Sequence, residues 1–167
     1  MGQTQTHNAI ACFVPSSNNG IKGTVKFHQN GKCEIKLQGL VPNHTHTIHI
    51  HEFGDLTGGC KTCGGHYNPE GVTHGSLKHP SHPRHVGDLC NNIVADSKGI
   101  VAETHYFPDV IVNDILGRSV VIHKLTDDLG MQGIYEGKKF KSYSEMSLSE
   151  LKAYANKRNY RKGRCFV

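Results

Sequence analysis

Histidine is the residue type that most clearly indicates chemistry here, because 13 of the 167 residues are histidines. His49 and His51 alternate within an apolar stretch, so a β-strand there would point both imidazoles to one face. Four further histidines and one aspartate follow along the chain: His66, His74, His85, His123 and Asp88. Imidazole suits both copper and zinc, and a carboxylate added to imidazoles favours zinc. A single histidine such as His123 in an apolar strand is usually a core residue, but the group as a whole predicts a metal site.

The stretch from Gly54 to Asp88 contains three of these histidines and shows no hydrophobic period. It is rich in glycine, proline, histidine and polar residues. A loop of this length in a compact domain is either functional or disordered. A bound metal explains how it is ordered, because the free energy of metal binding then takes the place of core burial.

Short strands separated by turns are the elements that must position these residues. Apolar residues alternate from Ile21 to Phe27 and from Cys33 to Leu37, with the hairpin signal Gln29-Asn30-Gly31 between them. The other expected strands are 9–14, 46–51, 91–95, 99–106 and 119–124. Many short strands with glycine-rich turns predict an all-β fold, either an antiparallel sandwich or a barrel. The chain length predicts one domain over residues 1–167.

The end of the chain has a different pattern. Ser147 and Glu150 form a capping-box signature, and apolar residues then recur at helical spacing, so we expect an amphipathic helix from Leu148 to about Asn159. Much of the net charge of +5 also lies in this part. The basic residues form either a nucleic-acid-binding tail or a solvated face. No zinc-finger, RNP or basic-zipper pattern is present, which favours the solvated face and predicts no nucleic-acid partner.

Signals for membranes and secretion are weak. No stretch approaches the roughly 18 apolar residues of a membrane helix, and Met1–Asn8 lacks the apolar segment of a secretory signal. We therefore expect a cytoplasmic protein without stable membrane association. Gly2 fits the short N-myristoylation pattern, but a single acyl chain anchors a protein only marginally.

The six cysteines give two expectations. Cys60 and Cys63 have the CxxC spacing of zinc and redox sites, but no second CxxC and no thioredoxin-like context accompanies them, so we interpret the pair as coincidental. Cys12 and Cys33 fall in alternating apolar stretches and are expected to be core thiols. Without a secretory signal, a framework of disulfides is not expected from the residues alone.

Five segments together resemble the copper/zinc superoxide dismutase family. They are His46–Asp55, Gly59-Cys60, Gly65–Pro69, Arg84–Leu89 and Val121–Gly130, and the similarity covers roughly residues 8–130. The resemblance implies a Greek-key antiparallel β-sandwich, or flattened barrel, with two long loops beside the metals. It also implies dismutation of superoxide to dioxygen and hydrogen peroxide, copper and zinc as cofactors, superoxide anion as substrate, and a homodimer.

The resemblance also assigns ligands by position. The implied copper ligands are His49, His51, His66 and His123, and the implied zinc ligands are His66, His74, His85 and Asp88. His66 would therefore bridge the two metals as an imidazolate, an anion that two flanking dications stabilise. Asp127 would link the outer ring nitrogens of His49 and His74 and so fix both tautomers.

Two further assignments come from the resemblance. A disulfide would join Cys60 to Cys165, as a family exception to the rule that cytosolic disulfides are uncommon. An arginine would guide superoxide to copper, and either Arg161 or Arg164 fits that role.

Several positions depart from the family pattern. Thr47 and Ile48 replace the small residue and the aromatic that usually precede the first ligand. The interval between His74 and His85 is longer than usual and adds His79 and His82, which either compete for zinc or are solvated. The part after Gly130 is longer and helical, and the last strand is cut short, which makes the homodimer less secure.

Two other functions fit the same residues less well. One is a non-enzymatic copper carrier or metal-binding domain of the same fold, and the other is an anion- or nucleic-acid-binding sandwich with vestigial metal sites. The complete ligand sets favour the enzyme over both.

Overall fold

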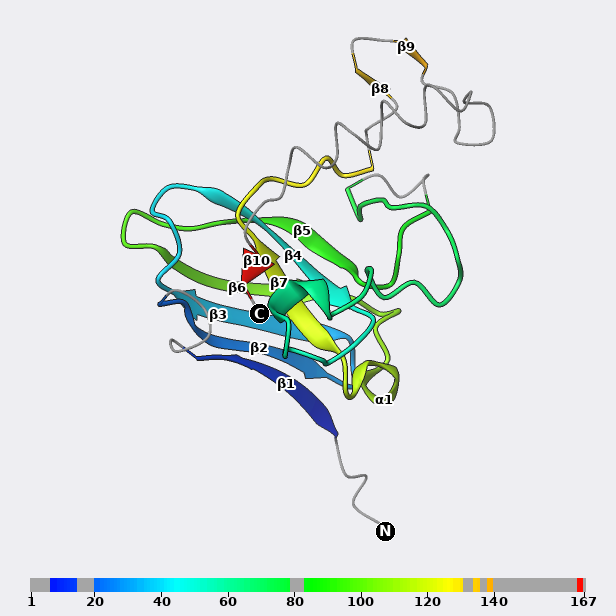
Figure 1. Cartoon of the computed structure of the whole chain (residues 1–167), viewed down its shortest axis with the longest axis horizontal. Helices are drawn as coiled ribbons and strands as arrows, with labels where there is room; N and C mark the ends of the chain where they lie inside the picture. Colours follow the sequence, from blue (N-terminus) through cyan, green and yellow to red (C-terminus); the bar gives the residue numbers. More distant parts are fainter. Residues whose placement is uncertain are drawn as a thin grey trace.

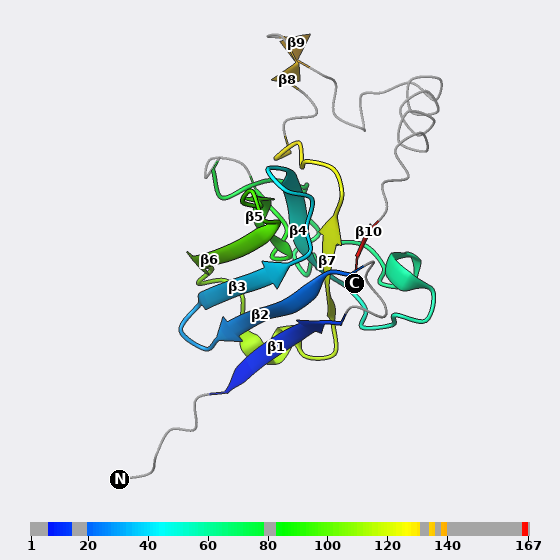
Figure 2. The ribbon, with the colours of Figure 1, turned by 90° about the vertical axis from the view of Figure 1, so that its left-hand side faces the viewer.

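Two four-stranded antiparallel sheets pack face to face as a β-sandwich (Figures 1 and 2). The computed structural model describes residues 7–14, 20–78, 83–130, 134–135, 138–139 and 165–166, with side chains described up to residue 130 apart from Asn91. The first sheet has the order β1 (Asn8–Phe13), β2 (Lys22–His28), β3 (Lys32–Gln38) and β6 (Ile100–Tyr106). The second has the order β10 (Cys165–Phe166), β7 (Ser119–His123), β4 (Thr45–His51) and β5 (Asp88–Val94). Two short strands, β8 (Ile134–Tyr135) and β9 (Lys138–Lys139), pair with each other.

The connections follow a Greek key. The chain crosses between the sheets after β3, after β5 and after β6, so that β6 pairs with β3 and β7 pairs with β4. The predicted all-β Greek-key sandwich is therefore confirmed. Each predicted strand is present within about two residues of its expected bounds, except β5, which begins earlier, at Asp88.

The β2–β3 hairpin shows how the alternating pattern builds the core. Cys33, Ile35 and Leu37 are buried at every second position of β3, while the residues between them face outward. The turn that joins the two strands contains Gly31 with φ 83°, a left-handed conformation that glycine adopts without steric cost. The side chain of Asn30 accepts a hydrogen bond from the backbone N–H of Lys32, which closes the turn.

Strand β4 departs from this alternation because both of its faces are covered. Residues 46–51 are all buried. Ile48 and Ile50 belong to the hydrophobic core between the sheets. Thr47, His49 and His51 occupy the other face. That second face is covered by the loop between β4 and β5, so β4 forms the floor of the candidate site.

The loop between β4 and β5 has little regular structure, as expected. It contains one short 3₁₀ turn, η1 (Gly59–Lys61), and returns to the sheet through an isolated bridge between His51 and His66. The Arg84 guanidinium donates hydrogen bonds to the carbonyls of His85 and Asp88 and pairs with the Asp109 carboxylate. Side-chain and backbone hydrogen bonds thus fix much of the loop, together with the buried Cys63 and with Tyr67 and Val86, which pack against the core.

The structure corrects the expectation for Cys12. Its side chain is exposed, because the inward positions of β1 are the odd-numbered ones that lead to the buried Phe13. Cys33 is buried as expected. A short helix, α1 (Val112–Ile115), was not predicted, because one helical turn is too short to show a periodic pattern.

Several expectations concern residues outside the described ranges. The C-terminal helix from Leu148 to Asn159 is one of them, and the others concern Gly2, His79, His82, Arg161 and Arg164. Among the helices in the described ranges, none has the length and hydropathy needed to cross a membrane.

Candidate metal centre

Strands β4 and β7 and the returning loop bring four imidazoles together. His49 and His51 come from one face of β4, and His123 ends the neighbouring strand β7. His66 reaches the group through its bridge to His51. One ring nitrogen of each of the four lies within 4.8 Å of the others. These are the four residues predicted as copper ligands.

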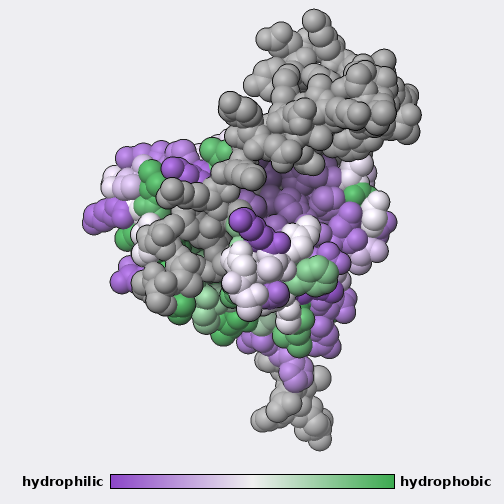
Figure 3. Space-filling model, viewed as in Figure 1, coloured by the Kyte–Doolittle hydropathy of each residue, from purple (hydrophilic) through white to green (hydrophobic). Residues whose placement is uncertain are grey.

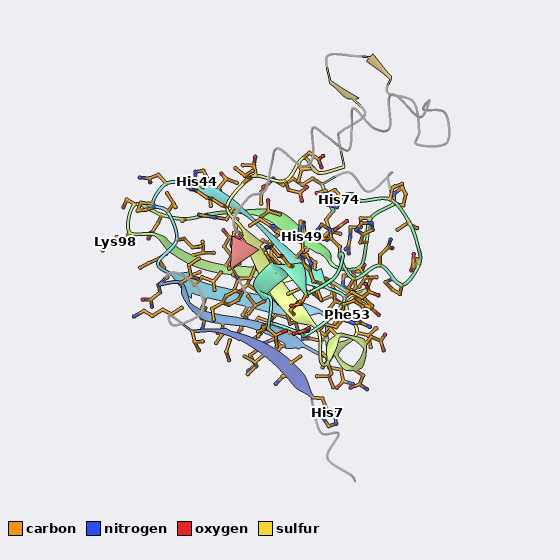
Figure 4. All side chains as sticks on the ribbon, in the orientation of Figure 1. His7, His44, His49, Phe53, His74 and Lys98 are labelled. Carbon is orange, nitrogen blue, oxygen red and sulfur yellow. The ribbon has the colours of Figure 1, made fainter. Side chains whose placement is uncertain are left out.

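A second group of donors surrounds the carboxylate of Asp88, which is fully buried at the start of β5. Its oxygens lie 2.8 Å from His66 Nδ1, 2.9 Å from His74 Nδ1 and 3.2 Å from His85 Nδ1. The same carboxylate accepts hydrogen bonds from the backbone N–H groups of Gly75 and His85, each at 3.0 Å. The three imidazoles predicted as zinc ligands thus each contact the predicted carboxylate. The donor atoms here that lie within 4.8 Å of one another are those of His49, His66, His74 and Asp88, a set that contains His49 and not His85. Figure 4 shows His74 on the loop, beside the strand that carries His49.

Most imidazoles of the two donor groups hydrogen-bond to an oxygen through one ring nitrogen, and their other ring nitrogen points toward the remaining donors of the group. His51 Nδ1 donates to the carbonyl of Gly64 at 3.0 Å, and His85 Nε2 donates to the carbonyl of Val72 at 3.1 Å. Among the described residues, three nitrogens of these imidazoles are buried without a hydrogen-bond partner, namely His51 Nε2, His49 Nδ1 and His123 Nε2. His85 Nδ1 instead faces the Asp88 carboxylate at 3.2 Å. Buried polar atoms without partners are costly. Metal ions suit such nitrogens, because metal-bound histidine commonly hydrogen-bonds through its other ring nitrogen.

Asp127 connects the two groups. Its carboxylate lies 2.8 Å from His49 Nε2 and 2.9 Å from His74 Nε2, and only 4% of its side chain is exposed. This is the position that the sequence assigned to it. Asp128 was not predicted: its carboxylate is 3.5 Å from His74 Nε2, and only its place next to Asp127 in the sequence could have indicated it.

Burial sets the charge state of the first group. Desolvation lowers the pKa of His49 to about 4, that of His51 to about 4 and that of His123 to about 3. These imidazoles are therefore neutral at pH 7, which is the form that binds metals.

The second group carries charge in the metal-free protein. Burial disfavours the ionised form of Asp88, but hydrogen bonds from His66, His74 and His85 outweigh it and lower its pKa. Burial likewise opposes protonation of His74, but hydrogen bonds to Asp127 and Asp88 raise its pKa to about 10. A dication bound by His74 Nδ1 and the Asp88 carboxylate would take the place of the proton on that nitrogen, while His74 Nε2 keeps its contact with Asp127.

His66 is the imidazole of the first group that lies beside open surface. Its side chain is 23% exposed, and it lines a hollow with Tyr67 and Arg118. The Arg118 guanidinium carbon lies 3.8 Å from the centre of the Tyr67 ring. Figure 3 shows hydrophilic surface on the side where the loop with His74 lies. The hollow next to the first donor group is therefore polar, and it contains both the Arg118 guanidinium and the Glu52 carboxylate.

The cysteines are divided between free and bonded. Cys60 is disulfide-bonded, and Cys63 is a free, buried thiol, so the CxxC pair acts neither as a disulfide nor as a thiol pair. Strand β10 lies against η1, and Cys165 is opposite His123 in the ladder. The side chain of Cys165 lies outside the described ones, so its pairing with Cys60 stays a prediction.

Comparisons with known proteins agree with this geometry. The family model described as copper/zinc superoxide dismutase (SODC) matches residues 21–143. The extracellular superoxide dismutase [Cu-Zn] of Drosophila melanogaster is 43% identical over 136 residues, 75% of this chain and 72% of that protein. The superoxide dismutase [Cu-Zn] of Paramecium bursaria Chlorella virus 1 is 42% identical over 125 residues, 71% of this chain and 65% of that protein. The superoxide dismutase [Cu-Zn] of Candida albicans is 36% identical over 138 residues, 77% of this chain and 86% of that protein.

A solved structure has the same fold. The crystal structure of the clock protein EA4 superposes with a TM-score of 0.65 and 33% identity, covering 83% of this chain and 88% of that one. Together with the histidine and aspartate groups, the family match implies copper and zinc as the cofactors. The chain belongs to the copper/zinc superoxide dismutase family.

Proposed function

We propose that this chain dismutes superoxide at a copper/zinc centre bridged by His66. Copper would be held by His49, His51, His66 and His123, and zinc would be held by His66, His74, His85 and Asp88. The observation that carries the proposal is the position of His66. It belongs to both donor groups, with its Nδ1 2.8 Å from Asp88 and its ring centre 3.9 Å from that of His49.

The reaction removes superoxide in two halves. One superoxide gives up an electron and leaves as dioxygen, and a second takes up that electron with two protons and leaves as hydrogen peroxide. When bound, copper supplies the one-electron chemistry because it alternates between Cu(II) and Cu(I), and zinc holds the loop in place.

The protein supplies a proton position at His66. Because its Nδ1 faces Asp88, its Nε2 is turned toward the first donor group. We assign to His66 Nε2 the uptake of a proton in the first half and its return to the reduced substrate in the second. The neutral, buried histidines around it do not compete for that proton, because their pKa values lie well below 7.

The remaining expectations belong to this proposal. They are a single domain over residues 1–167, a Cys60–Cys165 disulfide, a cytoplasmic location and a guiding arginine at Arg161 or Arg164. The homodimer is proposed from the family resemblance, and exposed apolar side chains such as Leu116, at 61% exposure, are positions at which it can be tested. Location is tested by fractionating cells that express the chain, since one relative is named as an extracellular enzyme.

The His123→Ala variant tests the proposal. His123 belongs to the first donor group and lies outside the second, so copper binding and dismutation should fall by at least about 100-fold while zinc binding remains. His105→Ala is the matched control, because His105 is on β6 and pairs with Glu103 away from both groups. Full activity in copper-loaded His123→Ala protein would overturn the proposal.

A further inference from the structure

The segment after β7 holds Asp127 in place without belonging to a sheet. Strand β7 ends at His123, and among the described residues Lys124–Gly130 have no ladder partners. Their backbone is fixed by side chains from the neighbouring strands instead. The Thr47 hydroxyl donates to the carbonyl of Leu125 at 2.7 Å. The Asn92 amide binds both backbone groups of Asp127, at 2.9 and 3.3 Å.

Thr47 is well placed for this role. It lies on β4 in register with Asn92 on one side and with His123 on the other, so it sits where three strands meet the segment. Its side chain shares the face of β4 that carries His49, and the residue is only 3% exposed. A carbonyl oxygen can only accept a hydrogen bond, so the hydroxyl must be the donor.

The residue that the Thr47 hydroxyl bonds, Leu125, lies two positions before Asp127, whose carboxylate joins the two donor groups. Asp127 lies within 2.9 Å of both His49 Nε2 and His74 Nε2, so a displacement of its backbone alters both contacts. The branched Thr side chain is restricted at χ1, which aims the hydroxyl at one acceptor.

We propose that Thr47 is a positioning residue for the metal centre: its hydroxyl fixes Leu125 and thereby sets the Asp127 carboxylate between His49 and His74. The Thr47 hydroxyl bonds the Leu125 carbonyl rather than a donor atom, so it acts through Asp127. The inference rests on the proposed function for its effect on metals. Its structural part, the placement of Asp127 by Thr47, can be measured in metal-free protein.

Three variants separate the hydroxyl from the shape of the side chain. Thr47→Val keeps the branched shape and removes the hydroxyl, and Thr47→Ser keeps the hydroxyl and removes the methyl group. Thr104→Val is the control, because Thr104 is an exposed residue of β6 on the other sheet. Each variant is made in the full chain and prepared both without metal and with zinc replaced by cobalt.

The first readout is amide hydrogen exchange in the metal-free protein. The Asp127 N–H donates to Asn92, and the Leu129 N–H donates to the Asp127 carboxylate. One neutral hydrogen bond corresponds to about a fivefold change in a local opening equilibrium. We therefore expect Thr47→Val to exchange at these two amides about fivefold faster or more, while Thr47→Ser and Thr104→Val match the parent.

The second readout is the visible spectrum of cobalt in the zinc site and its rate of loss to a chelator. Thr47→Val should shift the cobalt bands and lose the metal about three- to tenfold faster, somewhat less than the effect of removing a direct partner of a ligand. Thr47→Ser should restore both properties.

The outcomes are distinct. Parent-like exchange in Thr47→Val overturns the inference, and so does a Thr47→Ser variant as impaired as Thr47→Val, because the hydroxyl is then not responsible. If exchange is faster in Thr47→Val while the parent protein binds no metal, Thr47 still places Asp127, but the proposed function and the effect of Thr47 on metals are both overturned. Faster exchange with an unchanged cobalt spectrum and release rate also overturns the effect on metals.

Discussion

Replacing Asp88 with alanine removes the carboxylate at the centre of the second donor group. Asp88 is fully buried, accepts hydrogen bonds from the backbone of Gly75 and His85, and lies within 3.2 Å of a nitrogen of three imidazoles. Asp88→Ala therefore has two separable effects. It loosens the loop in the metal-free protein, and it removes one of the proposed zinc ligands.

Both effects can be given magnitudes. Loss of two charge-assisted hydrogen bonds at roughly 1.5–3 kcal/mol each lowers the free energy of unfolding of the metal-free protein by about 3–6 kcal/mol. In a chain of this size, that corresponds to a fall in melting temperature of about 6–24 °C. Loss of a ligand should weaken zinc binding by at least about 100-fold, which removes about 2.7 kcal/mol of the stabilisation that zinc provides.

Thermal unfolding with and without zinc measures both effects. Asp109→Asn is the matched control, because it disrupts the exposed carboxylate that pairs with Arg84 in the same region. Because the Arg84 side chain is only 10% exposed, this control also lowers the melting temperature of the metal-free protein. It should nevertheless keep the full response to zinc, because Asp109 belongs to neither donor group. If zinc raises the melting temperature of Asp88→Ala and of the parent equally, Asp88 is not a zinc ligand and the assignment of the second group is wrong.

Three further predictions concern residues near the chain end and the surface. Peptide mapping without reductant should recover Cys60 joined to Cys165, and free thiols at both positions in active enzyme would refute the pair. Either Arg161→Ala or Arg164→Ala should lose about tenfold or more of the superoxide rate while keeping both metals, as expected for a residue that steers an anion; unchanged rates in both would end that assignment. Leu116→Glu should shift the sedimentation of the protein toward monomer, since it places a charge in an exposed apolar surface; a parent that already sediments as a monomer contradicts the homodimer.

Much of the fold could be predicted because one physical pattern dominates it. The alternation of apolar and polar residues in segments such as Cys33–Leu37 predicts which face of the strand is buried, and the Asn30-Gly31 turn predicts where the chain reverses. The alternation of His49 and His51 likewise placed two imidazoles on one face before any partner was known. The histidines of the loop were identified by their residue type and by resemblance, since the loop itself has no period.

The remaining features depend on tertiary contacts that no local pattern encodes. Cys12 was misplaced because a run of apolar residues such as Ala9–Val14 does not state which of its two faces is inward. The hydrogen bond from Thr47 to Leu125 joins residues 78 positions apart, so it becomes visible only when β4 and β7 lie side by side. Nothing in the sequence except its position next to Asp127 predicts that Asp128 lies near His74.

Dismutation of superoxide at a copper/zinc centre is tested most directly with the purified protein. Its copper and zinc contents are measured first, and the rate of superoxide decay is then measured in its presence. We expect one copper and one zinc per chain, and a rate constant approaching the diffusional ceiling of about 10⁸–10⁹ M⁻¹s⁻¹ known for superoxide dismutases. Protein that holds zinc alone, or both metals without accelerating the decay of superoxide, would contradict this function.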